Sequence, residues 1–329
     1  MANPIRVAQI VGKMNGGGVE AVVMNYYRHI DRSKVQFDFL VDSDSTLVPR
    51  EEIESLGGRV FEIPPYQHVI EYQRELHRLF KQEGWKIVHS HINALSVFPL
   101  RAAKKAGVPV RIAHSHSTSG KGEYAKNALK AVLKTQSNRY PTHRFACSKF
   151  AGEWLFGDAA EFEVVYNAID LDRFRFNVEA GAQGRAGLGL VGNQFAIGHV
   201  GRFTAQKNHA FLIDVFTEVA KRRDDAVLLL VGTGEAGASV KALVDERGLT
   251  DRVKFLGQRS DVNRLYQAFD AFVLPSLYEG LGLVGVEAQV AGLSCLLSDA
   301  ITREVDVTGE CTFLPIDTPV EWADAICSL

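Results

Sequence analysis

Two carboxylates in the C-terminal part of the sequence have the type and spacing to bind a polar ligand. Glu279 lies in a glycine-rich segment after a short apolar run, and Glu287 follows eight residues later, where we expect a helix. Gly280 and Gly282 let the backbone approach a ligand closely, and N–H groups at a helix N-terminus favour phosphate or polarised hydroxyl groups. With a helix that begins near Leu281, Glu287 lies roughly 9 Å along its axis at about 1.5 Å per residue. This separation suits two different hydroxyl-bearing groups better than one shared proton; a solvated acidic helix face is the alternative.

Two cations follow the predicted strand Phe195–Val200. Arg202 offers a planar fork of N–H donors, and Lys207 adds a compact charge five residues later. Because both lie at the carboxyl end of a strand, the pair predicts a clamp for a diphosphate. A solvated basic loop is the alternative interpretation.

Four histidines end two consecutive predicted strands. His89 and His91 alternate onto one face of the first strand, and His114 and His116 do the same on the next. Four imidazoles could bind a metal, but no acidic ligands cluster with them, and a phosphate-bound Mg²⁺ prefers carboxylates. We therefore expect no metal and a neutral histidine bonded to a ligand hydroxyl or carbonyl, although for each histidine taken singly a satisfied place within the core is the more common case.

Two glycine-rich segments could bind phosphate. Gly16-Gly17-Gly18 follows the first strand and precedes a helix, so its N–H groups could hold an anion or simply form a flexible turn. Gly232 to Gly237 matches the pattern G-x-G-x-x-G. A nicotinamide site would need an acidic residue after the next strand, which here ends in Gly257-Gln-Arg259, so we expect no such site.

The elements that must position these residues alternate between short β-branched runs and helical patterns. The alternation predicts parallel sheets with crossover helices. It restarts after the polar, glycine-rich stretch Asn177–Gly192, and among its later strand-like runs is Val262–Ala268. We expect two Rossmann-like doubly wound domains, residues 1–170 and 171–329, that face each other across a ligand-binding cleft.

Composition and charge narrow the class of protein. A chain of 329 residues is too long for one ordinary core, and its 46% hydrophobic and 23% charged residues are typical of a globular protein. No apolar run is long enough to span a bilayer, no signal peptide pattern is present, and Cys147, Cys295, Cys311 and Cys327 form no C-x-x-C pair. We expect a cytoplasmic enzyme with reduced thiols.

A block of basic residues predicts a partner surface. Residues 101–149 contain eleven Lys and Arg against the single acidic residue Glu123. Within the block, Lys126, Lys130 and Lys134 recur along one stripe of a predicted amphipathic helix at 125–136. We expect this helix to lie on the anionic inner face of the cell membrane, with no role in nucleic-acid binding; an ordinary surface helix is the alternative.

Taken together, these segments resemble the GT-B-fold retaining glycosyltransferases of family 4, in the branch that builds exopolysaccharide and capsule repeat units. The motifs that carry the resemblance span almost the whole chain: Gly16 to Glu20, His114 to His116, Tyr166 to Asp170, Gly201 to Asn208, Val231 to Gly234, Phe255 to Gly257 and Pro275 to Ala288.

The resemblance implies a role for each motif. The resemblance implies that Arg202 and Lys207 hold the diphosphate of a UDP-linked sugar, with Glu287 on the ribose and Glu279 on the donor sugar. The remaining contacts that it implies are backbone N–H groups of Gly17, Gly18, Gly282, Leu283 and Val284, a base-binding loop at Gly257 and Arg259, and His116 at the donor sugar with His91 as its companion.

The implied reaction is transfer of a sugar to a membrane-held glycan or lipid-linked acceptor, with retention at the anomeric carbon. Arg202, Lys207, Glu279 and His116 would be the catalytic residues, and neither a metal nor another cofactor is needed. A non-catalytic nucleotide-sugar binder is one alternative. A glycoside hydrolase is the other, and it would need its two carboxylates about 5–5.5 Å apart.

Two features depart from the family pattern. The family normally ends in a helix that crosses back onto the first domain, whereas this sequence ends at Leu329, so we expect that helix to be missing from a shortened chain. Gly285 also lies within the predicted Glu287 helix, where glycine costs up to about 1 kcal/mol against alanine.

Overall fold

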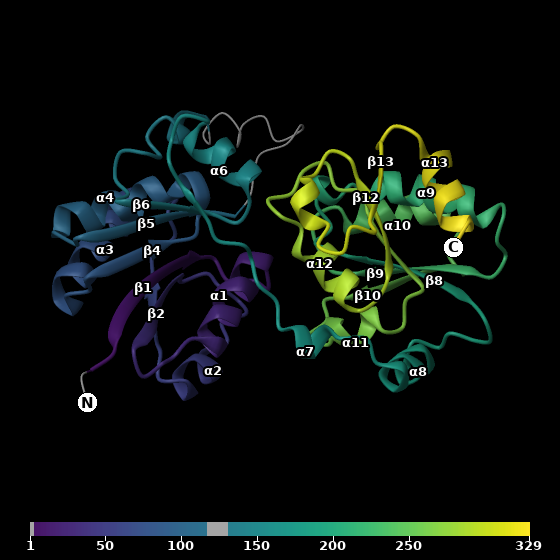
Figure 1. Cartoon of the computed structure of the whole chain (residues 1–329), viewed down its shortest axis with the longest axis horizontal. Helices are drawn as coiled ribbons and strands as arrows, with labels where there is room; N and C mark the ends of the chain where they lie inside the picture. Colours follow the sequence, from purple (N-terminus) through teal and green to yellow (C-terminus); the bar gives the residue numbers. More distant parts are fainter. Residues whose placement is uncertain (1–2, 117–130) are drawn as a thin grey trace. The chain divides into compact units, whose positions relative to one another are not determined.

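The computed structural model describes residues 3–116 and 131–329. They form two compact units that meet in the sequence between Ile169 and Asp170, each built on a parallel sheet with helices packed against it (Figure 1). The predicted α/β fold with two doubly wound domains is confirmed.

The first unit has seven parallel strands in the order β3-β2-β1-β4-β5-β6-β7. The strands are β1 (Ile5–Gly12), β2 (Val35–Asp42), β3 (Arg59–Ile63), β4 (Ile87–Ser90), β5 (Val110–Ser115), β6 (His143–Ala146) and β7 (Glu163–Val164). The helices are α1 (Gly18–His29), α2 (Arg50–Ser55), α3 (Val69–Glu83), η1 (Asn93–Ser96), α4 (Val97–Ala106) and α6 (Lys149–Phe156). Strand order reverses between β1 and β4, so the loops after these two strands flank the position where such sheets bind ligands.

A buried carboxylate joins the strands on one side of this sheet. Asp38 of β2 accepts hydrogen bonds from Arg6 on β1, Arg59 on β3 and the indole of Trp85. Burial acts to raise the pKa of Asp38, but the hydrogen bonds from these three residues outweigh it and hold the pKa below its ordinary value. The first unit thus carries an ionised group in its core that hydrophobic periodicity alone does not predict.

The second unit has six parallel strands in the order β10-β9-β8-β11-β12-β13. The strands are β8 (Phe195–Val200), β9 (Ala226–Val231), β10 (Val253–Gly257), β11 (Ala271–Leu274), β12 (Ser294–Ser298) and β13 (Thr312–Leu314). The helices are α7 (Leu171–Phe174), α8 (Val178–Gly187), η2 (Ala205–Lys207), α9 (His209–Ala220), α10 (Gly237–Glu246), α11 (Val262–Tyr266), α12 (Leu283–Val290), η3 (Arg303–Val305) and α13 (Pro319–Cys327). Every residue of β9 is buried, as its continuous apolar sequence predicts for a central strand.

Two segments of this unit differ from the sequence-based expectation. The glycine-rich stretch Asn177–Gly192 contains helix α8, whose first turn is capped by the side chain of Asn177 at 2.8 Å from Ala180 N. The run Val262–Ala268, which we expected to be a strand, forms helix α11 instead. Its apolar residues Leu265 and Tyr266 are adjacent in the sequence and both are buried, so the period-two alternation of a half-buried strand is absent.

Glycines in this unit mark places where backbones touch. A Cβ on Gly232 would collide with the carbonyl of Gly201, and a Cβ on Gly234 would collide with the backbone of Phe203. A Cβ on Gly285 would lie 3.1 Å from Val305 Cγ2, so the loop after β12 packs closely on α12. Packing therefore accounts for Gly232 and Gly234, the first two glycines of the G-x-G-x-x-G match, and for the glycine within α12, whereas a Cβ on Gly237 would meet nothing within 4 Å.

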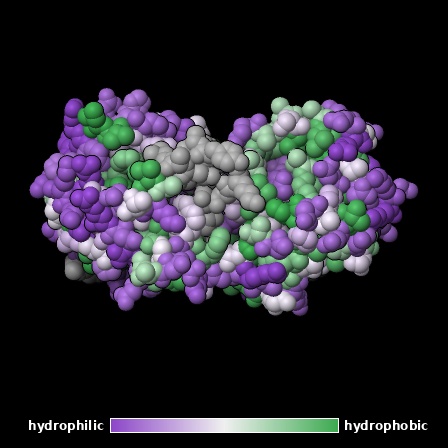
Figure 2. Space-filling view, turned by 90° about the horizontal axis from the view of Figure 1, so that it is seen from above, coloured by the Kyte–Doolittle hydropathy of each residue, from purple (hydrophilic) through white to green (hydrophobic). Residues whose placement is uncertain are grey.

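The distribution of hydrophobic residues on the surface and the lengths of the helices are relevant to membrane contact. Hydrophilic and hydrophobic residues are mixed over the face shown in Figure 2. Among the described helices, none combines the length and the apolar character needed to cross a bilayer.

Candidate active site

A buried ion pair joins the loops that follow β8 and β11, which flank the point where strand order reverses in the second sheet. Lys207 ends η2, and its Nζ lies 2.6 Å from Glu279 Oε1. Gln206 donates to Glu279 Oε2 at 3.1 Å and to the carbonyl of Tyr278 at 2.9 Å. Only 13% of the Lys207 side chain and 10% of the Glu279 side chain are exposed. The site therefore has opposite charges fixed in advance at the ligand-binding edge of this sheet.

Arg202 lies in the same loop as Lys207 but is exposed to solvent. Within the described part of the chain, no hydrogen bond or ion pair involves its guanidinium group. Arg202 therefore keeps its planar fork of donors available for an anion, whereas Lys207 must first share its charge with Glu279.

Glu287 lies on α12 beside a buried phenol. The Tyr266 hydroxyl donates to Glu287 Oε2 at 2.9 Å and also lies 3.1 Å from the carbonyl oxygen of Val284. Burial raises the pKa of Glu287 to about 7, while the Tyr266 hydroxyl and the charges of Arg173 and Lys207 act in the opposite direction. The charge of Glu287 therefore changes near neutral pH, and the charge of Lys207 influences its pKa. Glu287 belongs to the same polar site as Lys207.

Helix α12 presents its N-terminus beside the ion pair. Gly282, the N-cap residue, has a φ of 81°, a conformation that L side chains rarely adopt, and Leu283 begins the helix. The N–H groups of the first turn have no intrahelical acceptor by helix geometry. The N–H groups of Gly282, Leu283 and Val284 are thus at a helix N-terminus, where donation to an anion or a hydroxyl group is favoured.

The loop after β10 is held by its own contacts. Gly257 has a φ of 67°, and its carbonyl accepts from Gly232 N at 2.8 Å. Arg259 forms a bidentate pair with Asp261, with Nε to Oδ1 at 2.7 Å and Nη2 to Oδ2 at 2.6 Å. A base in this loop would therefore meet an arginine that is already neutralised.

In the first unit, a carboxylate already occupies part of the glycine-rich loop. Glu20 accepts from Asn15 N at 3.0 Å and from Gly16 N at 2.6 Å. Gly17 is the N-cap of α1 and Gly18 is its first residue. The loop binds an anion, as the sequence suggested it could, but in this structure the anion is the side chain of Glu20.

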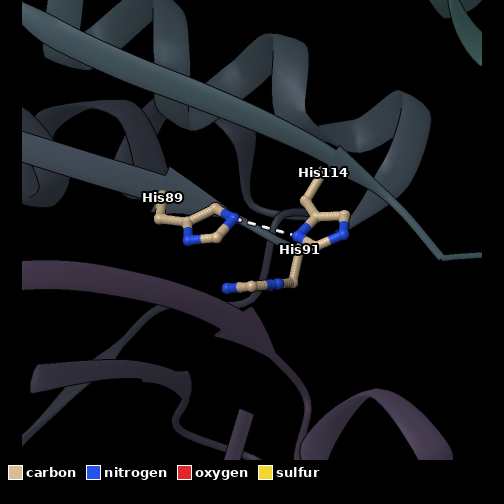
Figure 3. Close-up of side chains that lie close together, drawn as sticks. All are labelled: His89, His91 and His114. Carbon is tan, nitrogen blue, oxygen red and sulfur yellow. Dashed lines mark hydrogen bonds between the residues drawn. The ribbon is translucent and has the colours of Figure 1, made fainter. Parts of the chain in front are cut away.

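The four histidines form a stacked ladder at the carboxyl ends of β4 and β5. Figure 3 shows the first rung, in which a hydrogen bond joins His89 Nε2 to His114 Nδ1 at 3.1 Å. The second rung joins His91 Nδ1 to His116 Nε2 at 2.8 Å. Ring centroids lie 4.0 Å apart between His89 and His91 and 3.9 Å apart between His114 and His116. The alternation that placed each pair on one face is confirmed.

Both ring nitrogens of His91 and His116 have partners within the first unit. His91 Nε2 lies 2.8 Å from Gln9 Oε1, and His116 Nδ1 lies 3.2 Å from Asn167 Oδ1. Burial lowers the pKa of His116 to about 4, although the Asn167 contact opposes this, and it lowers the pKa of His91 well below the ordinary value. A ligand hydroxyl would have to displace Asn167 or His91 to bond to His116.

Among the described residues, three histidines of the same cluster lie close enough together to bind a metal ion. One nitrogen from each of His89, His91 and His114 lies within 4.8 Å of the others. His89 and His114 are already hydrogen-bonded to each other, and both nitrogens of His91 have partners. The arrangement is that of a hydrogen-bonded network rather than of three lone pairs that converge on one point.

Sequence reasoning missed Gln206, Tyr266 and Glu20, which act by holding the predicted residues. Tyr266 gave no signal, because a tyrosine in an apolar run is ordinary, and Glu20 stood in the motif Gly16 to Glu20 without a role of its own. Lys126 and Lys130 of the predicted membrane helix lie outside the described residues. Lys134 lies over the ring of Trp154, with its Nζ 5.5 Å from the centroid.

Comparison with known proteins assigns the chain to a family. The family described as Glycosyltransferase Family 4 matches residues 16–173, and the family described as Glycosyl transferases group 1 matches residues 194–329. The putative glycosyltransferase EpsF of Bacillus subtilis is 40% identical over 98% of this chain and 86% of its own length. The chain is a family 4 glycosyltransferase. An Escherichia coli glycosyltransferase, UDP-Gal:alpha-D-GlcNAc-diphosphoundecaprenol alpha-1,3-galactosyltransferase, is 31% identical over 68% of this chain and 60% of its own length.

Solved structures share the fold of this glycosyltransferase. Anabaena HepE in complex with UDP-glucose matches with a TM-score of 0.82 at 21% identity, over 98% of this chain and 89% of that one. The lipopolysaccharide glycosyltransferase WaaG matches with a TM-score of 0.70 at 14% identity, over 99% of this chain and 91% of that one. At these identities the likeness concerns the fold alone, and it agrees with the expected GT-B architecture.

Proposed function

We propose that this glycosyltransferase moves a sugar from a UDP-linked donor to a lipid-linked or glycan acceptor in the synthesis of a surface polysaccharide, with retention at the anomeric carbon. The observation that carries the proposal is the buried Lys207–Glu279 pair together with Arg202 of the same loop, whose guanidinium group has no partner among the described residues. The positive charges that would bind a diphosphate and the carboxylate that would bind sugar hydroxyls lie together at one edge of the sheet.

Each of these groups has a distinct task in the proposed reaction. Arg202 and Lys207 stabilise the charge that develops on the diphosphate as its bond to the anomeric carbon breaks. Glu279 accepts hydrogen bonds from the donor sugar, and Glu287 accepts them from the ribose. His116, with His91 behind it, faces the donor sugar once the contact with Asn167 opens.

The proton and the new bond can be accounted for without an enzymic nucleophile. The acceptor oxygen bonds to the anomeric carbon on the face that the diphosphate leaves, and the departing phosphate oxygen takes the acceptor proton. The two cations supply the charge compensation for this step, so the proposed reaction needs neither a metal nor another cofactor.

The names of relatives support the donor and acceptor classes. The Escherichia coli relative uses UDP-Gal and a diphosphoundecaprenol-linked sugar, and a Staphylococcus aureus relative, 25% identical over 86% of this chain, is a capsular polysaccharide biosynthesis glycosyltransferase. An acceptor of this kind is held in a membrane. We accordingly propose that the protein works in the cytoplasm at the inner face of the cell membrane, with Lys126, Lys130 and Lys134 as its contact.

Mass spectrometry tests the proposal directly. The chain is incubated with a panel of UDP- and GDP-linked sugars and a diphospholipid-linked N-acetylglucosamine acceptor, and the products are identified by mass and by anomeric proton coupling. We expect release of UDP and a glycosylated acceptor in which the transferred sugar keeps the anomeric configuration that it had in the donor. An inverted product would contradict the retaining mechanism, and transfer only from GDP-linked sugars would contradict the donor.

The same experiment separates the alternatives. A non-catalytic binder would leave the donor intact, and a glycoside hydrolase would release free sugar from a glycan without any nucleotide donor. Glu279 and Glu287 are bonded to different partners, Lys207 and Tyr266, which favours two separate tasks over a joint hydrolytic one.

A further inference from the structure

A buried histidine lies close to Lys207. His199 lies in β8 and is fully buried. Its Nδ1 lies 2.8 Å from the carbonyl oxygen of Val273, and since a carbonyl only accepts, Nδ1 must carry the proton. Burial, His209 and Lys207 lower the pKa of His199 well below its ordinary value, so the ring is neutral and Nε2 is a bare acceptor. No hydrogen bond reaches Nε2 from the described residues.

The missing side chain of Gly201 connects this lone pair with Lys207. A Cβ on Gly201 would lie 3.2 Å from His199 Nε2 and 3.0 Å from both Cδ and Cε of Lys207. The acceptor nitrogen and the end of the lysine chain therefore border the same small space. The ammonium nitrogen lies one bond beyond Cε, so rotation about the terminal torsions of Lys207 can redirect it from Glu279.

The groups nearby leave few possible donors for Nε2. His209 stands edge-on to His199, with ring centroids 4.8 Å apart, and neither of its nitrogens has a partner in the described residues. Phosphate oxygens in the neighbouring cradle would be acceptors. The Lys207 ammonium has three N–H donors, of which one is bonded to Glu279 in this structure.

We propose that His199 is a positioning residue whose Nε2 accepts a hydrogen bond from the Lys207 ammonium when the donor is bound. The diphosphate then draws the ammonium group away from Glu279, and Lys207 exchanges that carboxylate for the diphosphate and His199. The proposal rests on the function proposed above. It gives Lys207 a second hydrogen-bond acceptor, His199 Nε2, for use once the ammonium group has left Glu279.

Two substitutions at position 199 distinguish loss of the hydrogen-bond acceptor from a change in packing. His199→Asn keeps an N–H for the Val273 carbonyl but has no atom at the place of Nε2. His199→Gln reaches that place with an amide oxygen and so restores an acceptor. We expect His199→Asn to weaken UDP binding, measured by calorimetry, by about tenfold or more, as loss of a hydrogen bond to a charged group implies. His199→Gln should recover most of that loss.

A double-mutant cycle tests whether the effect passes through Lys207. In a Lys207→Ala background, His199→Asn should cause no further loss of UDP affinity. An equal loss in that background would overturn the proposal, because the lone pair would then serve a buried water or the packing of β8. Gly201→Ala, which inserts a methyl group between the two side chains, should reproduce the His199→Asn effect.

A spectroscopic measurement observes the hydrogen bond itself. With ¹⁵N-labelled histidine, addition of UDP to the parent chain should move the His199 Nε2 resonance from that of a bare acceptor towards that of a hydrogen-bonded one. Equal UDP binding by parent and His199→Asn would overturn this proposal and leave the proposed function intact. Failure of the parent chain to bind UDP would overturn the proposed donor, and this proposal with it.

Discussion

Glu287 is the residue whose protonation state decides how it can bind a ribose. Its pKa is raised to about 7, chiefly by burial. Above that value the carboxylate can accept two hydroxyl hydrogen bonds, and below it the neutral acid accepts less well. The same shift has a consequence for stability: because the folded pKa lies above the unfolded one, the contribution of this group to folding is lost as pH rises from about 4.5 through about 7.

We predict that UDP affinity of the parent chain rises with pH and levels off above the pKa of Glu287. Calorimetric titrations between about pH 6 and about pH 8 measure this, because the carboxylate fraction changes most in that range. Glu287→Gln should bind UDP more weakly and lose this pH dependence. A pH profile that Glu287→Gln leaves unchanged would assign the titration to another group.

Arg202 and Lys207 differ in their surroundings, and their alanine variants should differ accordingly. Both should lower turnover by about 10²-fold or more, as removal of a positioned charge at a developing oxyanion does. Arg202→Ala should leave the urea midpoint unchanged, because its side chain is exposed. Lys207→Ala should lower it, since Glu279 is left nearly buried without its countercharge. Loss of stability in both variants alike would contradict this distinction.

At the scale of elements, α8 shows why a helix can be hard to read from its sequence. Gly181, Gly184 and Gly187 interrupt its apolar pattern. Two of them are close to α11 and the residues after it: a Cβ on Gly181 would lie 2.7 Å from Gln267 O, and one on Gly184 would lie 3.2 Å from Ala268 Cβ. Tertiary contact rather than helix propensity selects those glycines.

The glycines of α8 allow a matched pair of predictions. Gly187→Ala should raise the free energy of unfolding by about 0.5–1 kcal/mol, because a Cβ there meets nothing within 4 Å and alanine favours the helix. Gly181→Ala should lower it by about 1–3 kcal/mol, because the Cβ presses on a carbonyl group. Urea denaturation measures both, and a stabilised Gly181→Ala would show that α8 can move away from α11.

At the scale of the whole molecule, the acidic and basic residues are unevenly distributed along the chain. Its formal charge is −2, yet residues 101–149 are strongly basic. Such a block attracts an anionic surface within about a Debye length, roughly 8–10 Å at physiological salt. The proposed membrane contact is therefore electrostatic and reversible.

We predict that the chain sediments with anionic vesicles but not with zwitterionic ones, at about 1 kcal/mol per lysine near the surface, and less at high salt. The variant Lys126→Glu/Lys130→Glu/Lys134→Glu should lose this binding. The exposed lysines at positions 34, 81 and 86 provide a control with the same change of charge, and their triple glutamate variant should still sediment. Equal loss in both variants would indicate an effect of net charge alone.

The sequence predicted the two α/β units, because the hydrophobic period distinguishes strands from helices. It also predicted where Arg202, Lys207, Glu279 and Glu287 lie along the chain, because these residues follow predicted strands. It could not predict that Lys207 pairs with Glu279 or that Tyr266 bonds to Glu287, since each contact joins segments more than 20 residues apart that only the sheet order brings together. The Glu20 contact was missed for a different reason: a flexible turn and an anion-binding loop have the same composition.

The contrast between Gly232 and Gly18 shows how substitutions among relatives can be interpreted. Gly232 cannot carry a side chain, because a Cβ would collide with the Gly201 carbonyl, so its retention in related sequences would report packing and nothing about chemistry. Gly18 begins α1 with ordinary backbone angles, and a Cβ there meets nothing within 4 Å. Nothing in the described fold requires glycine at position 18. If relatives keep it nonetheless, the selective pressure must come from a molecule that approaches the chain from outside.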